Sequence, residues 1–343
     1  MSAISLFSNT HQESPGLWAL AWRRLRADRV AMFALAVVCL FLLTVMLSKA
    51  GWVATDWERE VGLSYAPPSF LGAEAIVEGT LQAALPLPDN RFDPLRDIIQ
   101  EIKETQDYQV DTNTATKLRT LPFGADKWGH DVALKSIKGA ETSMIVGLSA
   151  ALLATLIGSL FGALAGYFGG YIDDAFNWFY SIFTSIPYLL LVLAFAAVLQ
   201  QRGIMTIVLI LALTGWTAPF RLMRAEYLKH KNREYVWAAD AIGASHRRRI
   251  FIHIFPNVSH VALVQISISV VGFIKAEVIL SYLGFGVAVG DVSWGSMLNE
   301  AQNELMLGKW WQLTAATVAM AVLVTAFSVL TDALRDALDP KLK

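Results

Sequence analysis

Long apolar runs alternate with shorter polar stretches along the chain. A helix needs roughly 20 apolar residues to cross a bilayer, and six runs come close to this length or exceed it: Val30–Leu47, Met144–Phe168, Phe176–Leu199, Ile204–Phe220, Val261–Leu283 and Leu313–Leu330. None of them alternates apolar and polar residues, so transmembrane β-strands are excluded. The pattern predicts an all-α membrane protein with six transmembrane helices.

The composition agrees with this prediction. Of the 343 residues, 55% are hydrophobic and 17% are charged, whereas a soluble domain has about 25% charged residues. The net charge of -1 leaves no basic excess that would favour nucleic acid as a partner. The single cysteine, Cys39, can form no disulfide within the chain.

Basic residues concentrate in three segments outside the apolar runs. They lie before the first run (Arg23, Arg24, Arg26, Arg29), between the fourth and fifth (Arg221, Arg224, Lys229, Lys231, Arg233, Arg247, Arg248, Arg249) and after the sixth (Arg335, Lys341, Lys343). The positive-inside rule therefore places both termini and the fourth loop in the cytoplasm. The expected organisation is a cytoplasmic segment 1–29, a first helix 30–47, an external segment 48–141, a transmembrane core 142–333 with a cytoplasmic loop 222–258, and a cytoplasmic tail 334–343.

Two patterns predict local structure beyond the spans. In the external segment, Leu95, Ile98, Ile99 and Ile102 follow helical spacing and predict an amphipathic helix over Asp93–Thr105. In the second span, glycines recur every fourth residue, which lets another helix approach closely and predicts a tightly packed bundle: they are Gly158, Gly162, Gly166 and Gly170.

Signatures of enzyme chemistry are missing from the sequence. It contains no G-x-x-x-x-G-K-[ST] phosphate loop, no G-x-S-x-G and no H-E-x-x-H. His246, His253 and His260 recur every seven residues, but we expect Pro256 to interrupt any helix through them, and no carboxylate or thiol joins them at ligand spacing. We therefore expect no catalytic, cofactor or metal site in this chain.

The fourth loop is the most informative segment. Over Glu234–Ala244, an apolar face with helical spacing comprises Tyr235, Ala238, Ala239 and Ile242. Gly243 is a plausible helix stop, and the basic run Arg247–Arg249 and a second helix follow. The pattern alone leaves two interpretations open: a helix that docks in a partner's groove, or one that lies on anionic lipid headgroups.

Five blocks in order resemble one family. Arg233–Asn257, "REYVWAADAIGASHRRRIFIHIFPN", resembles the EAA loop of binding-protein-dependent ABC importer permeases. The other blocks are Phe123–Val132 "FGADKWGHDV", Gly166–Asp173 "GYFGGYID" with Ser185-Ile186-Pro187, Ser281–Gly286 "SYLGFG" with Ser293-Trp294-Gly295, and Asp332–Pro340 "DALRDALDP". Together they resemble the C-type subunit of the dipeptide/oligopeptide/nickel branch. The departures are Trp237 at the motif's glutamate, His130 at an arginine, and Trp178 and Ser181 where an arginine and an aspartate are usual.

The resemblance implies a type I ABC importer permease fold with a long external loop between the first two helices. It implies a bacterial inner-membrane heterodimer with a second permease subunit, two ATPase subunits that bind ATP and Mg, and an external solute-binding protein. Peptides are the expected substrate. Nickel or another small solute stays open, and a stand-alone secondary transporter or channel is the alternative from another class.

The resemblance also supplies candidate site residues. Those assigned to ATPase coupling are Arg233, Glu234, Tyr235, Ala238, Ala239, Gly243, Ala244, Pro256 and Asn257. Those assigned to the gate or pathway are Pro187, Glu277, Ser281 and Gly284. Two interpretations of Glu277 are open: it bonds to backbone near the Ser281–Gly286 exit, or it faces the bundle interior and fixes the outer gate, with a partner on the second permease subunit or the binding protein. We favour the gate, because intramembrane carboxylates are costly and usually functional. We expect Lys275 to snorkel outward.

Overall fold

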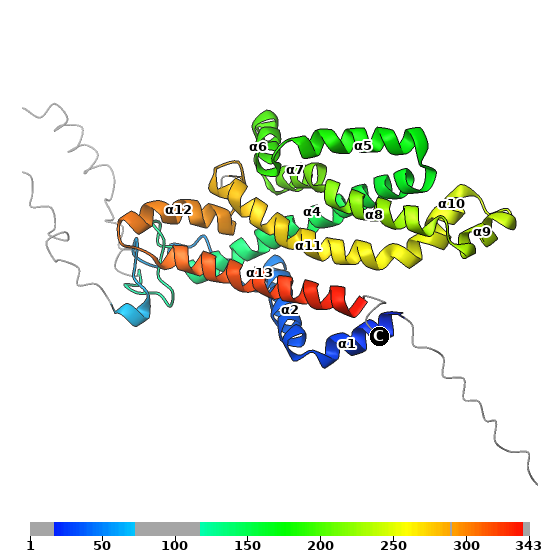
Figure 1. The fold of residues 1–343 in the computed structure, drawn as a ribbon. Coiled ribbons are helices and arrows are strands. Elements are labelled where there is room, and N and C mark those ends of the chain that lie inside the picture. The colour runs from blue at the N-terminus through cyan, green and yellow to red at the C-terminus, as the bar shows by residue number, and fades with distance from the viewer. Residues whose placement is uncertain (1–16, 73–116, 289, 339–343) are drawn as a thin grey trace, which may run out of the picture.

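The computed structural model describes residues 17–72, 117–288 and 290–338, and within them the regular elements are helices (Figure 1). The helix expected over 93–105 lies outside these ranges. The elements are α1 (Leu17–Ala27), α2 (Arg29–Lys49), the short η1 (Ser69–Leu71), α4 (Val132–Phe168), α5 (Gly170–Ser185), α6 (Tyr188–Leu199), α7 (Ile204–Gly215), α8 (Thr217–His230), α9 (Glu234–Ala241), α10 (His246–Arg248), a π-helical segment (Arg249–Ile254), α11 (Phe255–Tyr282), α12 (Trp294–Met306) and α13 (Trp311–Leu338).

Four of these helical stretches are long and apolar enough to cross a membrane. They are α2, α4, the stretch His246–Tyr282 and α13. Two bent pairs, α5 with α6 and α7 with α8, bring the number to six if each pair is one span. The all-α membrane fold predicted from the hydropathy pattern is therefore confirmed.

The third span differs from the expected straight helix over Phe176–Leu199. It is broken into α5 and α6, which meet at 90°. Pro187 disfavours helical backbone in the residue before it, and Ile186 accordingly adopts φ -100° and ψ 133°. Apolar residues lie on both sides of the break, and Thr184, Ser185 and Pro187 interrupt the run at the break itself.

Tight packing of α4 against α8 confirms the prediction from the glycine stripe for three of its four members. A Cβ on Gly162 would lie 2.6 Å from the Phe220 carbonyl oxygen, and one on Gly166 would lie 2.6 Å from that of Arg224. Gly158 meets the Trp216 carbonyl in the same way. Gly170 does not belong to the stripe, because it has φ +52° and begins α5 with open space beside it.

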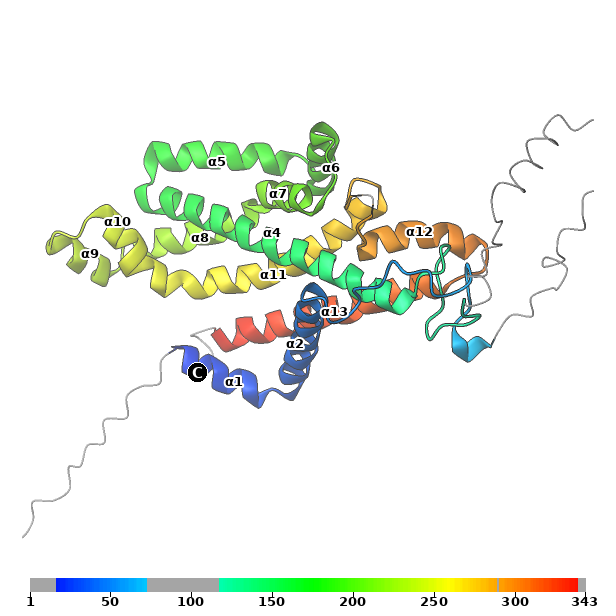
Figure 2. The ribbon, with the colours of Figure 1, turned by 180° about the vertical axis from the view of Figure 1, so that it is seen from behind.

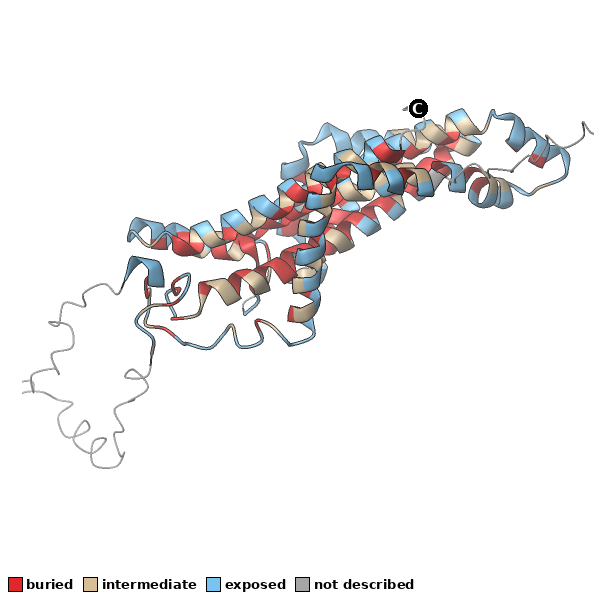
Figure 3. Ribbon diagram, turned by 90° about the horizontal axis from the view of Figure 1, so that it is seen from below, coloured by how far each residue is buried: buried red, intermediate tan, exposed pale blue. Residues whose placement is uncertain are grey.

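The bundle has two distinct ends (Figures 1 and 2). We call the end that carries α9 and α10 the loop end, and the end that carries α12 and segments 53–72 and 117–131 the α12 end. Seen from below, buried residues follow the facing sides of the long helices, whereas outward faces are exposed (Figure 3). On α4 the outward residues Leu152, Leu156 and Leu160 are apolar, as contact with lipid tails requires.

Helices extend into segments that we expected to be irregular. α4 begins at Val132, inside the expected external segment 48–141, because its early charges are paired within the protein. α12 occupies the loop between the last two spans and starts with a capping box between Ser293 and Ser296. α1 packs on the end of α13, where Ala21 meets Ala337 and Leu338.

Candidate functional site

The fourth loop folds as a helix, a turn and a second helix. α9 ends at Ala241, and Gly243 turns the chain with φ +82°, a conformation that favours glycine. The Gly243 N–H donates to the Asp240 carbonyl at 2.8 Å, and the Ala244 N–H donates to that of Ala239 at 2.9 Å. Gly243 is therefore needed for the shape of the turn.

The inner side of this loop is anchored to the bundle. Val236 and Ala239 are buried, at 3% and 4% exposed. Val236 packs in an apolar cluster with Ala163, Met223, Tyr227, Ile250, Ile254 and Val258. The Tyr227 hydroxyl donates to the Ile250 carbonyl at 3.1 Å. An ion pair of 2.6 Å between Arg249 and Asp240 joins the second helix to the first. The loop is thus held as one body with α4, α8 and α11.

The outer side corrects the apolar face that we predicted. Ala239 points inward, because it lies three residues after buried Val236 and shares its face. Ile242 is 83% exposed and Trp237 is 61% exposed, with exposed Ala238 between them. These three residues form a surface that we call the loop tip. Tyr235 is tethered to α8 instead, since its hydroxyl lies 2.8 Å from Nδ1 of His230.

The second helix of the loop continues without a break into the membrane. Residues His246–Tyr282 form one helical stretch, so the expectation that Pro256 interrupts it was wrong. Pro256 is the second residue of α11 and follows a π-helical turn, so the helical stretch passes through the proline at a change of helical geometry. The Asn257 side chain donates to the His253 carbonyl at 2.8 Å across the junction.

The remaining coupling candidates lie around the tip and its base. Arg233 and Glu234 are exposed at the start of α9, Ala244 is half-buried after the turn, and Pro256 and Asn257 are exposed on α11. The structure therefore brings all nine candidates into one loop, with Ala239 as the one that is buried.

Glu277 lies fully buried near the far end of α11. One of its carboxylate oxygens accepts from the Ser143 hydroxyl of α4 at 2.6 Å, and the other accepts from the Ser281 hydroxyl at 2.7 Å. The Trp294 N–H of α12 approaches the same Ser143 oxygen at 3.4 Å. We call these four residues the serine–glutamate cluster. The expected partner on another subunit was wrong, because both oxygens are satisfied within this chain.

The other pathway candidates do not converge on Glu277. Ser281 belongs to its cluster, but Pro187 is exposed at the bend between α5 and α6. Gly284 is exposed in the turn after α11, with φ +85°. That turn contacts the start of α7, since the Gly203 N–H donates to the Gly286 carbonyl at 3.3 Å. Lys275 is exposed on α11, as an outward-facing lysine should be.

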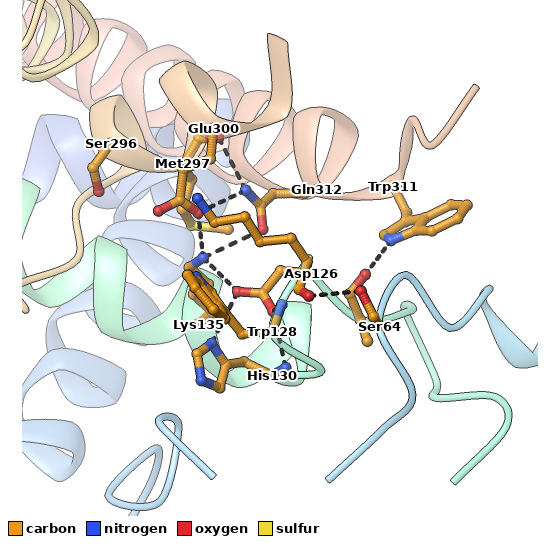
Figure 4. A network of polar contacts seen from close by, with 12 residues as sticks. Ser64, Asp126, Trp128, His130, Lys135, Ser296, Met297, Glu300, Trp311 and Gln312 are labelled. Atoms are coloured by element: carbon orange, nitrogen blue, oxygen red, sulfur yellow. Dashed lines mark hydrogen bonds and ion pairs between the residues drawn. The ribbon is translucent and has the colours of Figure 1, made fainter. Parts of the chain in front are cut away.

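A second polar cluster at the α12 end was not predicted (Figure 4). Lys135 is 2% exposed, and its ammonium donates to Asp126 at 2.7 Å and to Glu300 at 2.5 Å. The Gln312 side-chain nitrogen donates to Glu300 at 3.2 Å, and its side-chain oxygen accepts from the Lys135 ammonium at 3.5 Å. This lysine cluster joins segment 117–131, α4, α12 and α13.

Asp126 also organises the turn that precedes α4. It accepts from the backbone N–H groups of Trp128 at 2.8 Å and His130 at 2.9 Å, and its other oxygen lies 2.9 Å from Nδ1 of His130. Burial acts to raise the pKa of Asp126, but the Lys135 ammonium and the His130 N–H outweigh it and lower that pKa. Asp126 is therefore ionised and holds the turn across the physiological range.

Comparisons with known proteins agree with the arrangement. Residues 158–343 match the family described as binding-protein-dependent transport system inner membrane component, and residues 16–68 match the N-terminal TM domain of oligopeptide transport permease C. The dipeptide transport system permease protein DppC of Bacillus subtilis is 39% identical over 64% of this chain and 69% of its own length. The oligopeptide transport system permease protein OppC of the same organism is 37% identical over 64% and 72%. DppC of Lactococcus lactis is 29% identical over 94% and 90%. The chain belongs to the family of binding-protein-dependent transport system inner membrane components.

Proposed function

We propose that this chain is one of the two permease subunits of an ATP-driven importer, and that the imported solutes are peptides. The family membership supports the transport role, and the peptide assignment follows the dipeptide and oligopeptide permeases to which the chain is similar. A second permease subunit, two ATPase subunits that bind ATP and Mg, and an external solute-binding protein complete the assembly. The loop end and both termini face the cytoplasm, as the basic residues favour.

The observation that carries the proposal is the loop tip. The inner side of the fourth loop packs against the bundle and is joined to it by an ion pair, whereas Trp237 and Ile242 of the loop tip are exposed. Full burial of a side chain such as Ile242 contributes about 1.5–3 kcal/mol, so a partner groove that covers the tip gains stability from it. A short helix with an apolar outer face suits docking in a groove of the ATPase.

The long helix that follows the loop tip connects the docking site to the serine–glutamate cluster. The stretch His246–Tyr282 has 37 residues and is therefore about 55 Å long. One end carries the loop tip and the other carries Glu277 and Ser281. Movement of the ATPases would be transmitted along this helix to the serine–glutamate cluster, which ties it to α4 and α12. Alternating access then follows as a rigid-body change of the bundle.

The test replaces an apolar tip residue with a charged one. Ile242→Asp should abolish ATP-dependent peptide uptake by the reconstituted transporter, because the carboxylate would be buried unpaired in the ATPase groove. The chain itself should stay folded, since Ile242 is 83% exposed. Met306→Asp is the matched control, because Met306 is a similarly exposed apolar residue (76%) at the opposite end, and this variant should keep uptake. Normal uptake by Ile242→Asp would contradict the proposal.

A further inference from the structure

Glu304, on α12, is a buried carboxylate that takes no part in the hydrogen bonds and ion pairs described above. Its residue is 1% exposed, and neither carboxylate oxygen has a hydrogen-bond partner among the described residues. A charged carboxylate in such surroundings is costly unless it is paired, so the neutral, protonated form is favoured.

The charged neighbours of Glu304 leave it uncompensated. Lys135 of α4 faces it, but the Lys135 ammonium already bonds Asp126 and Glu300. Three carboxylates, Asp126, Glu300 and Glu304, therefore share one buried ammonium. The Lys127 backbone N–H favours the ionised form of Glu304 only weakly, as the last of the contributions.

Among the described residues, Lys135 is the cation with the largest effect on Glu304. On α4, Lys138 pairs with Glu141 at 2.8 Å. On α11, Lys275 is exposed and Glu277 bonds two serines. The charged residues of α13 begin only at Asp332. The imidazole of His130 is directed to Asp126, and the Lys309 ammonium lies over the Trp311 ring.

Burial is the main cause that raises the pKa of Glu304 to about 7, and the nearby Asp126 and Glu300 carboxylates add to the rise, whereas Lys135 opposes it. The pKa of an exposed glutamate is 4.5. The packed α12 end therefore holds a proton on Glu304 that an opened α12 end releases at the same pH.

We propose that Glu304 is a proton-binding site of the α12 end, through which the external pH controls how firmly α12 packs against α4 and segment 117–131. With the proton bound, the cluster holds Lys135, Asp126 and Glu300 with one neutral acid beside them. Without it, a second uncompensated negative charge loosens α12, which is the helix that also contacts Ser143 and Glu277 through Trp294.

The sign of the pH dependence follows from linkage. Between about pH 4.5 and about pH 7 the packed state binds the proton and the opened state does not, so stability falls as the pH rises through this window. Above about pH 7 both states are ionised, and the Glu304 contribution to the pH dependence ends.

The experiment titrates the full transporter in lipid nanodiscs and follows the unfolding temperature and the infrared carbonyl band of protonated carboxylic acids. Glu304→Gln keeps the shape and removes the proton site. Its unfolding temperature should be about 5 °C higher than that of the wild type at about pH 8, and the two unfolding temperatures should be equal at about pH 5. The infrared band that titrates near neutral pH should disappear in this variant. Glu304→Met should give the same pH profile as Glu304→Gln.

Asp291→Asn is the control, because Asp291 is an exposed carboxylate just before α12. It should keep the wild-type profile and the infrared band. Parallel melting profiles of the wild type and Glu304→Gln would overturn the proposal. A wild-type protein without a carboxylic-acid band that titrates near neutral pH would overturn it independently of any variant.

Discussion

The two ends of the molecule are stabilised by different interactions, apolar packing at the loop end and charged pairs at the α12 end. The loop end is held by apolar packing around Val236 and leaves Trp237 and Ile242 exposed. The α12 end buries charges: Lys135 and Asp126 are almost completely covered, and Glu300, the second partner of Lys135, is partly exposed. The first end is stabilised by apolar packing and presents an apolar surface. The second contains more buried negative than positive charge.

This difference predicts how each end responds to amino-acid substitutions. An uncovered apolar tip gains stability only from a second protein, so its substitutions should affect coupling and leave the fold intact. A buried charge cluster depends on every member, so its substitutions should affect the fold itself. The predictions that follow test this division, beginning with the largest effect.

Removal of the ammonium from the lysine cluster should do the greatest damage. In Lys135→Met, the buried Asp126 and the partly exposed Glu300 lose their shared cation. A buried charge that loses its partner costs about 3–5 kcal/mol. We expect a large drop in the unfolding temperature of the purified chain. Lys127→Met is the control, because Lys127 is an exposed lysine next to Asp126 in segment 117–131. This variant should melt like the wild type. Equal melting of the two variants would show that the cluster carries no stability.

A single methyl group between α4 and α8 should come next. Gly162→Ala places a Cβ 2.6 Å from the Phe220 carbonyl oxygen, so the helices must separate, at a cost of about 1–3 kcal/mol. Gly272→Ala, where nothing lies within 4 Å, should be neutral or stabilise by up to about 1 kcal/mol through helix propensity. Thermal unfolding of both variants decides the matter. If Gly272→Ala is the more damaging, the close approach of α4 and α8 is wrong.

The smallest effect on stability is expected at Glu277. In Glu277→Gln only one side-chain oxygen remains to accept from Ser143 and Ser281, so we expect a loss of about 1–2 kcal/mol together with a sharp fall in peptide uptake. Co-purification with the ATPases should persist, since the loop end is untouched. Lys275→Met, an exposed neighbour, should transport normally. Should Glu277→Gln lose the ATPases instead, the cluster would be needed for assembly rather than for movement.

The sequence was sufficient for the helical membrane fold and for the loop, and the reasons are local. Apolar runs reveal spans wherever they lie, and the turn at Gly243 is encoded within a few residues. The phase of the α9 face was misjudged because apolar residues occupy both sides of this helix, so spacing alone does not tell Val236 from Ala238.

The lysine cluster could not be predicted because its members are far apart along the chain. Lys135 pairs with Glu300, 165 positions away, and no local pattern shows such a contact. The sequence of α12 does carry a signal, since Trp294, Met297, Leu298 and Ala301 follow helical spacing after Ser293. The segment is too short and too polar to be a span, so hydropathy indicates only a loop. Apolar residues on both sides of Pro187 favour a single span by hydropathy, although Thr184, Ser185 and Pro187 interrupt the run.

The central claim is that the loop tip docks on an ATPase subunit, and site-specific cross-linking tests it most directly. A photoreactive residue at Ile242, introduced in the membrane of cells that make the whole transporter, should capture an ATPase subunit, whereas the same residue at Met306 should not. Capture of lipid alone at Ile242, with no ATPase under conditions that support peptide uptake, would contradict the account and favour a loop that lies on the membrane surface.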